Sequence, residues 1–135
     1  MASLKIKPLL VLLIATLVVT GISACKDKFD DTKETDERRL EALMTDIKNS
    51  SEQTKCENAA DWKFRAIGSK ACGGPAGYIA YSVKIDTNEF IKKVDEYTSD
   101  QKEFNKKWGI SSDCSLVNPP KSVMCENEKP KLVYQ

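Results

Sequence analysis

The 135-residue sequence contains no histidine. Histidine is the commonest general base, the usual partner of nucleophilic serine and cysteine, and a frequent zinc ligand. Its absence excludes Ser-His and Cys-His pairs and most zinc sites. Carboxylate pairs or a Ser-Lys dyad would remain, but the acidic residues lie mainly on expected helix faces, and Ser69-Lys70 are only neighbours in sequence. We therefore predict no enzyme activity, no catalytic residue, no metal site and no cofactor.

Strong net charge and a long apolar run are also missing. The chain has 21 basic and 20 acidic residues and no basic block, which argues against nucleic acid as a partner. The longest apolar run, residues 9–19, is broken only by Thr16 and is shorter than the roughly 20 residues that cross a bilayer as a helix. It follows the basic residues Lys5 and Lys7, an arrangement that is typical of a cleaved signal peptide.

The four residues Ile22-Ser23-Ala24-Cys25 end this N-terminal region. Small residues directly before a single cysteine resemble the lipobox of bacterial lipoprotein signal peptides. The resemblance implies that residues 1–24 are removed and that Cys25 is acylated. Several acyl chains together hold a protein stably on a membrane, here most simply the bacterial outer membrane, at its periplasmic face or at the cell surface. An ordinary secretory signal cut after Ala24 is the alternative.

Residues 25–34 comprise the lipidated cysteine and a polar, flexible tether. Lysine and acidic residues directly after the cysteine also resemble the surface-export signal of Bacteroidetes lipoproteins. The segment is therefore either a simple tether or a signal for export to the cell surface. Removal of the first 24 residues leaves 111, which is enough for one small domain. We place this single domain at residues 35–135.

Four cysteines remain in the domain once Cys25 is assigned to the lipid. They are Cys56, Cys72, Cys114 and Cys125. An even number in a small exported domain predicts two disulfide bonds. Three pairings are possible; we favour a bridge between the Cys72 loop and the C-terminal region, without choosing among the three. The spacings of 16, 42 and 11 residues do not match CxxC, which favours disulfides over zinc.

Two helices are expected from the apolar periodicity. The first begins at Thr35 or Asp36 and runs to about Lys48; we interpret its apolar stripe as a packing surface, with partner binding as the alternative. The second, over about residues 87–107, is the long core helix, with a capping box at its start and Gly109 just past its end. Its stripe comprises Phe90, Val94, Tyr97, Gln101, Phe104 and Trp108.

Four strands are expected as well. Apolar and charged residues alternate over residues 62–66, and aromatic and branched residues follow at 78–83. A terminal hairpin joins residues 122–125 to 131–134 across a turn at 126–130. The predicted fold class is α+β: one small antiparallel sheet of about four strands, the long helix packed on one face, a shorter N-terminal helix before it, and two disulfides.

Residues 68–77, which we call the glycine loop, hold four of the chain's six glycines. Gly68 and Gly73 have GxxxxG spacing, but a phosphate loop needs lysine and serine or threonine next, so we reject it. The loop is either a strained connection that needs glycine torsions or a recognition surface pinned by Cys72, with little ordering entropy to lose. In the second interpretation Lys70 is its exposed cation and Tyr78 its aromatic neighbour. The candidate binding residues are Ser69, Lys70, Gly73, Gly74, Pro75 and Tyr78.

The segments Trp62, Ile67–Lys70, Cys72–Pro75 and Tyr78–Ser82, with the C-terminal cysteine hairpin, are similar to the core of small Bacteroidetes-type lipoproteins. The similarity covers about residues 56–134 and implies a fold unit without an activity. We expect a lipid-anchored envelope lipoprotein, a non-catalytic binding or inhibitor-like module that uses the glycine loop on an envelope or extracellular protein or glycan. A structural envelope component without a specific ligand is the alternative, and a histidine-free glycan or peptide hydrolase is the third.

Overall fold

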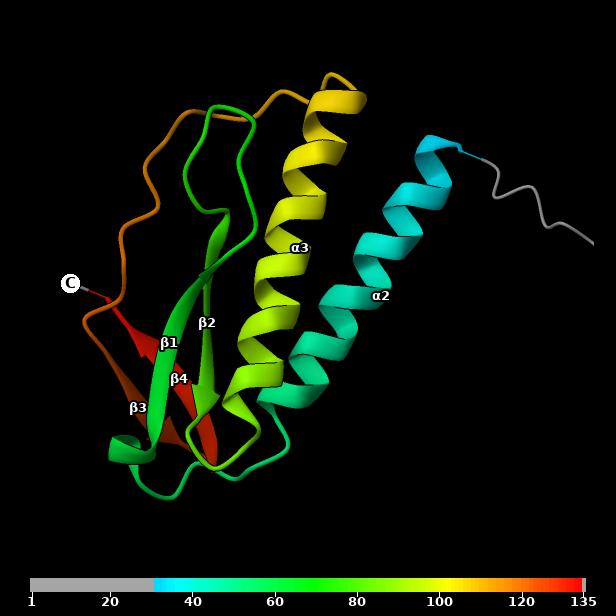
Figure 1. Ribbon diagram of the computed structural model, residues 1–135. Helices are drawn as coiled ribbons and strands as arrows, with labels where there is room; N and C mark the ends of the chain where they lie inside the picture. Colours follow the sequence, from blue (N-terminus) through cyan, green and yellow to red (C-terminus); the bar gives the residue numbers. More distant parts are fainter. Residues whose placement is uncertain (1–30, 135) are drawn as a thin grey trace, which may run out of the picture. The chain divides into compact units, whose positions relative to one another are not determined.

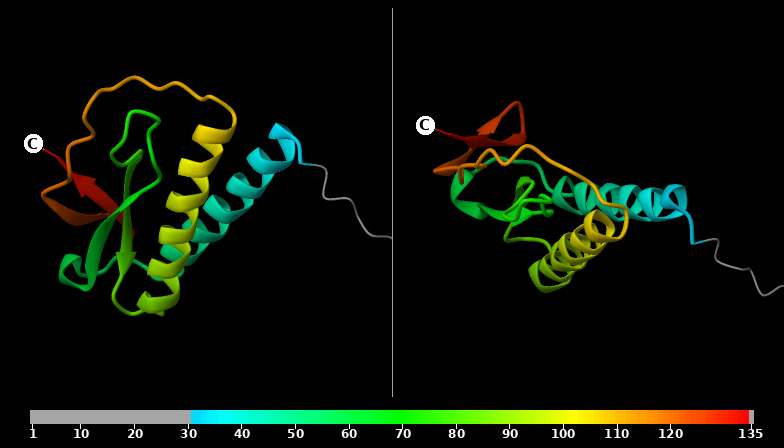
Figure 2. Two further views of the ribbon diagram at one scale, coloured as in Figure 1. Left: turned by 45° about the horizontal axis from the view of Figure 1, so that its top comes forward. Right: turned by 90° about the horizontal axis from the view of Figure 1, so that it is seen from above.

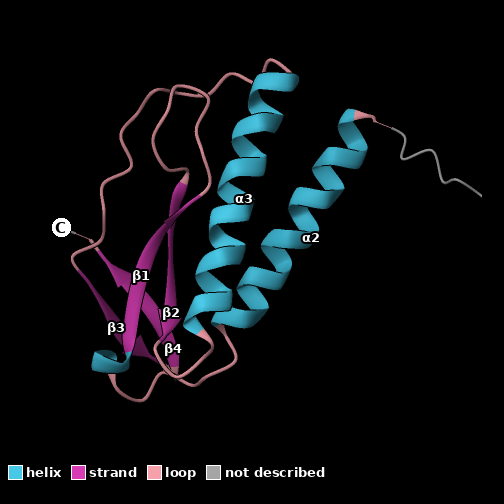
Figure 3. Ribbon diagram, viewed as in Figure 1, coloured by secondary structure: helices cyan, strands magenta, loops and turns pink. Residues whose placement is uncertain are grey.

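The computed structural model describes residues 31–134, so the predicted signal peptide and Cys25 lie outside the described residues (Figure 1). The described chain is α+β, as predicted, and neither of its long helices is apolar enough to cross a membrane. Figure 3 shows the helices and strands in separate colours. In chain order the elements are α2 (Lys33–Ser51), the 3-10 turn η1 (Ala59–Asp61), β1 (Trp62–Ile67), β2 (Gly77–Ser82), α3 (Thr87–Lys107), β3 (Ser122–Glu126) and β4 (Lys129–Val133).

Helix α2 is longer at both ends than its apolar stripe predicts. Its N-cap is Thr32, whose hydroxyl accepts a hydrogen bond from the backbone N–H of Thr35 at 3.2 Å. A threonine oxygen satisfies one of the N–H groups left free in a first helical turn, so the helix starts before Thr35. The stripe does pack inward, as predicted, and Ile47 is fully buried.

Helix α3 has the predicted bounds; Asp86 is its N-cap, although no hydrogen bond from the Asp86 N–H to the Glu89 side chain completes the predicted capping box within residues 31–134. The carboxylate of Asp86 accepts hydrogen bonds from the N–H groups of Asn88 and Glu89 at 3.1 and 3.0 Å. At the other end Gly109 has a φ of +59°, and the N–H of Ile110 reaches back to the carbonyl of Asn105 at 3.0 Å. This is a Schellman closure, which needs a left-handed residue just past the helix.

The four strands form two separate two-stranded sheets, which corrects the single four-stranded sheet expected from the sequence. Strand β1 pairs with β2 antiparallel from Trp62↔Ser82 to Ile67↔Gly77, and β3 pairs with β4 from Ser122↔Val133 to Glu126↔Lys129. Strand β4 begins earlier than the sequence predicts. Pro130 pairs with Cys125 and therefore belongs to the strand and not to the turn. The two hairpins are not joined edge to edge.

The reason is that the β1–β2 hairpin is apolar on both faces. On one face Trp62 and Ala80 are buried against Val123 of the second hairpin. On the other face Ile67 and Tyr81 are buried against α2 and α3, as part of a second apolar cluster. Successive residues of a strand point to opposite faces of the sheet. Stacking the second hairpin on one face therefore buries the apolar side chains of both faces, whereas a single four-stranded sheet would leave those of one face exposed to solvent. Figure 2, seen from above, shows the β1–β2 hairpin between the β3–β4 hairpin and the helices.

A disulfide joins the buried Cys56, which precedes η1 and β1, to the half-buried Cys125 of β3, with a Cα–Cα distance of 5.3 Å. The N–H of Cys56 also donates to the carbonyl of Glu128 at 2.8 Å. The bond closes a loop of 69 residues, and such a crosslink stabilises a fold by about 4 kcal/mol through the unfolded chain's lost entropy. The segment that leads into β1 is therefore covalently attached to β3.

The β3–β4 turn yields a stability prediction. Asn127 and Glu128 have φ values of 52° and 61°, a left-handed pair for which glycine is favoured at the second position. The variant Glu128→Gly should therefore stabilise the protein by about 1 kcal/mol, a rise of several degrees in the thermal midpoint. The ion pair with Lys55 that is lost is more than 60% exposed on both sides and contributes little. Glu128→Gln is the control, because it loses the charge and keeps the strain; a glycine variant no more stable than this control would contradict the prediction.

Candidate functional site

The glycine loop joins β1 to β2 beside the C-terminal half of α3 (Figure 1). Gly68, Gly73 and Gly74 have φ values of 74°, 95° and 81°. Residues other than glycine rarely adopt these backbone torsions, because their Cβ atom collides with the backbone. Three positions of the loop therefore need glycine torsions, which both interpretations of the loop allow. Gly77 is the first residue of β2.

Three polar side chains of α3 hold the start of the loop. The Thr98 hydroxyl accepts from the N–H of Gly68 at 3.0 Å, and the Gln101 side-chain oxygen accepts from the N–H of Ser69 at 2.7 Å. The Asn105 amide donates to the carbonyl of Ser69 at 2.8 Å. These bonds satisfy backbone groups that the strand ladder no longer serves.

Gln101 was expected in the apolar stripe of the core helix and instead anchors the loop. Its other amide atom donates to the Tyr97 hydroxyl at 3.2 Å. Neither Thr98 nor Asn105 was predicted from the sequence to be a site residue. Their signal was a polar row at positions 98, 101 and 105, which share one side of a helix because they are three and four residues apart.

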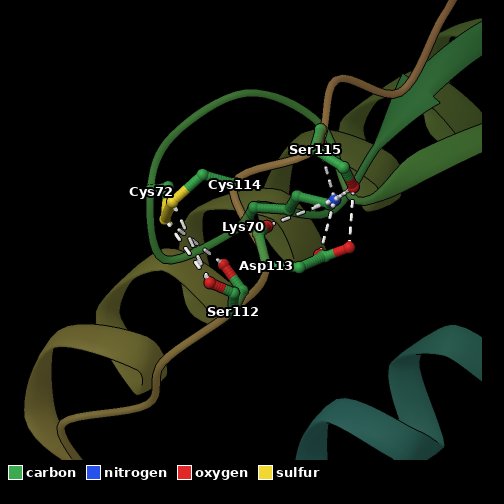
Figure 4. Close-up of polar contacts among 6 residues, drawn as sticks. All are labelled: Lys70, Cys72, Ser112, Asp113, Cys114 and Ser115. Carbon is green, nitrogen blue, oxygen red and sulfur yellow. Dashed lines mark hydrogen bonds and ion pairs between the residues drawn. A yellow bond between two sulfur atoms is a disulfide. The ribbon is translucent and has the colours of Figure 1, made fainter.

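Lys70 is not the exposed cation that the sequence suggested, because its side chain is only 15% exposed. Its ammonium group lies 2.9 Å from the Asp113 carboxylate, 2.9 Å from the Ser115 carbonyl and 3.0 Å from the Ser115 hydroxyl (Figure 4). The Ser115 hydroxyl in turn donates to the other Asp113 oxygen at 2.7 Å. The ammonium donors are thus used inside the protein, and Lys70 is an anchor between the loop and residues 113–115.

The second disulfide fastens the same two segments. Cys72 is bonded to Cys114, with a Cα–Cα distance of 5.6 Å, and both residues are exposed (Figure 4). Of the three pairings left open by the sequence, the structure has Cys56–Cys125 and Cys72–Cys114. The Cys72 loop is therefore tied to the segment that follows α3.

The loop and α3 enclose a cleft of about 560 Å³, which we call the loop cleft. Three of the six candidate binding residues line it, namely Ser69, Lys70 and Gly73. Lys102 and Lys106 of α3 also line it, and neither forms an ion pair with any residue in the described range. A partner's acidic group could meet both ammonium groups there, since they are one helical turn apart.

The other three candidates lie elsewhere. Gly74 and Pro75 do not line the loop cleft. Tyr78 is in β2 and lines a different cleft of about 490 Å³. Its ring packs against that of Phe64 in a T-shaped arrangement, with centroids 6.1 Å apart. It is therefore not the aromatic neighbour of Lys70. Among residues 31–134, no group of three acidic or cysteine side chains is arranged to hold a metal ion.

Substitution of two loop glycines should have unequal effects. A Cβ atom at Gly68 would lie 2.5 Å from the Gln101 side-chain oxygen and 2.9 Å from the Ala76 Cβ, whereas nothing lies within 4 Å of one at Gly73. Gly73→Ala should cost about 1 kcal/mol through its torsions alone. Gly68→Ala adds a collision with an anchored side chain and should cost about 3 kcal/mol. Urea unfolding of both variants measures the difference, and equal losses would show that the α3 anchor contributes nothing.

The Lys70–Asp113 contact predicts a pH dependence. Hydrogen bonds from Ser115 and Lys70 lower the pKa of Asp113 below its ordinary value of 3.8. A carboxyl group with a lowered folded-state pKa stabilises the fold above its unfolded-state pKa, and this contribution is lost as the pH falls through the folded-state value. The thermal midpoint of Asp113→Asn should therefore lie below that of the wild type at pH 6, and the gap should close towards pH 2. A gap of the same size at both pH values would contradict this assignment.

Comparison of the chain with protein-family models, with curated proteins and with solved structures finds no match. The site is therefore interpreted from its own geometry. That geometry comprises a loop anchored on α3, a cleft beside it, and a segment after α3 to which the loop is bonded twice.

Proposed function

We propose that the protein is a lipid-anchored lipoprotein of the bacterial cell envelope and a non-catalytic, inhibitor-like binding module. One observation carries the proposal: the glycine loop is held in one shape from two sides before any partner arrives. Side chains of α3 bind its first residues, while Lys70 and Cys72 bind it to residues 113–115. A surface that is already ordered loses little conformational entropy on binding.

Lipid attachment at Cys25 belongs to the same proposal and rests on the lipobox resemblance. Helix α2 has its N-cap at Thr32, so seven residue steps would separate the start of this helix from the lipidated cysteine. A chain of that length spans at most about 25 Å. The module would therefore act close to the membrane surface, on partners that reach the envelope.

The loop cleft is the part of this surface that we expect a partner to enter. Its volume of about 560 Å³ suits a side chain or a sugar unit, and it is lined by loop residues as well as by Lys102 and Lys106. Glu103 also lines it, so the two lysines leave a net positive wall. This favours an acidic group of a protein or glycan at that position.

The test uses the immobilised full-length protein and two double variants with equal charge changes. Lys102→Glu/Lys106→Glu inverts the cleft wall, whereas Lys63→Glu/Lys92→Glu inverts two exposed lysines that do not line the cleft. We expect a discrete partner from envelope extract or from secretions of host or competing cells, retained by the wild type and the control and reduced at least tenfold by the cleft variant. Circular dichroism checks that all three proteins are folded.

A partner that binds all three proteins equally would overturn the cleft as the site. No captured partner from any source would favour the alternative of a structural envelope component, in which the glycine loop only closes the fold.

A further inference from the structure

The connection between α3 and β3 is long and has no regular structure. Its 14 residues, from Trp108 to Lys121, contain no helix and no strand. Connections of this length within a compact domain are usually either functional or disordered. This one is fastened at both ends, which favours a functional role.

The upstream fastening is the contact with the glycine loop. Cys114 is bonded to Cys72, and the Lys70 ammonium contacts Asp113 and Ser115 on either side of it. The downstream fastening is at the start of the second hairpin. There Pro120 is buried, and the N–H of Lys121 donates to the carbonyl of Val133 at 2.8 Å.

Between these fastenings, Leu116 and Asn118 are exposed and Val117 is half-buried. The Leu116 side chain is 91% exposed, whereas the other exposed large apolar side chains of the described chain range from 40% to 48%. No backbone N–H or carbonyl of residues 116–118 is hydrogen-bonded within residues 31–134. The segment therefore offers both an apolar side chain and free backbone groups.

That combination fits one kind of partner. A peptidase binds its substrate as an added strand, through backbone hydrogen bonds, and selects one side chain in a pocket. We propose that residues 115–119 form an inhibitory loop that enters the cleft of a peptidase that cleaves after large apolar residues, with Leu116 in the selecting pocket. This inference rests on the proposed function, because it takes the module to be a non-catalytic binder.

The fastenings explain why such a loop would inhibit the peptidase and not be consumed. Hydrolysis would add one water across the Leu116–Val117 bond and leave a carboxylate and an amine. The new ends would be held by Cys114 on one side and by Pro120 and Lys121 on the other. They would stay near each other, so the bound product would not leave readily and the bond could re-form.

The test uses the full-length protein in detergent with chymotrypsin and subtilisin as probes, and trypsin as the peptidase of different specificity. The wild type should competitively inhibit the hydrolysis of a chromogenic peptide by at least one of the two probes, and mass spectrometry should show the chain largely intact. Leu116→Gly should weaken inhibition about 30-fold, since a buried leucine side chain contributes that much affinity. Leu116→Lys should transfer inhibition to trypsin.

Two further variants make the result specific. Met124→Lys places a lysine at an exposed apolar position of β3 and should neither weaken the original inhibition nor create inhibition of trypsin. Cys72→Ser/Cys114→Ser removes one fastening without leaving a free thiol, and should convert the loop into a substrate cut after Leu116.

Three outcomes would overturn the inference: no inhibition of either probe by the wild type, rapid cleavage at Leu116 without inhibition, or no gain of trypsin inhibition by Leu116→Lys. In each of these outcomes, the proposed function would still be supported if the capture experiment found a partner whose binding is lost in the Lys102→Glu/Lys106→Glu variant. The two failures are thus distinguishable.

Discussion

The β1–β2 hairpin buries apolar side chains on both of its faces, and the remaining elements are arranged around that requirement. Trp62 and Ala80 need the second hairpin as a cover, while Ile67 and Tyr81 need the two helices. A two-stranded sheet is hardly stable by itself, so the layers on either side supply most of its stability. The hairpin also carries the glycine loop at its end, and its position between two layers places that loop against α3.

The loop combines three kinds of anchorage with different physical sensitivities. The hydrogen bonds from Thr98 and Gln101 depend on the position of α3, the Lys70–Asp113 contact depends on pH, and the Cys72–Cys114 bond depends on redox conditions. The last two of these also bind the glycine loop to residues 113–115. The recognition surface that we propose therefore includes the segment after α3, and the loop acts partly as its support.

Lys70 illustrates how a residue type can suggest the wrong role. A lysine in a glycine-rich turn has room to reach solvent, and a charge is costly to remove from water without a partner. The structure supplies that partner through Asp113, with two further acceptors on Ser115. The exposed position on this surface belongs instead to Leu116, an apolar residue in a stretch without any periodic pattern.

Helix α3, the terminal hairpin and the existence of a loop at residues 68–77 were predictable from the sequence alone. A cap such as Asp86, an apolar period or a glycine cluster acts over one or two helical turns or a few strand residues. The stacking of the hairpins, the cysteine pairing and the role of Lys70 were decided only by the tertiary structure. Each depends on groups far apart along the chain, 69 residues for Cys56–Cys125 and 43 for the Lys70–Asp113 contact, and local pattern carries no information about which distant surfaces bury each other.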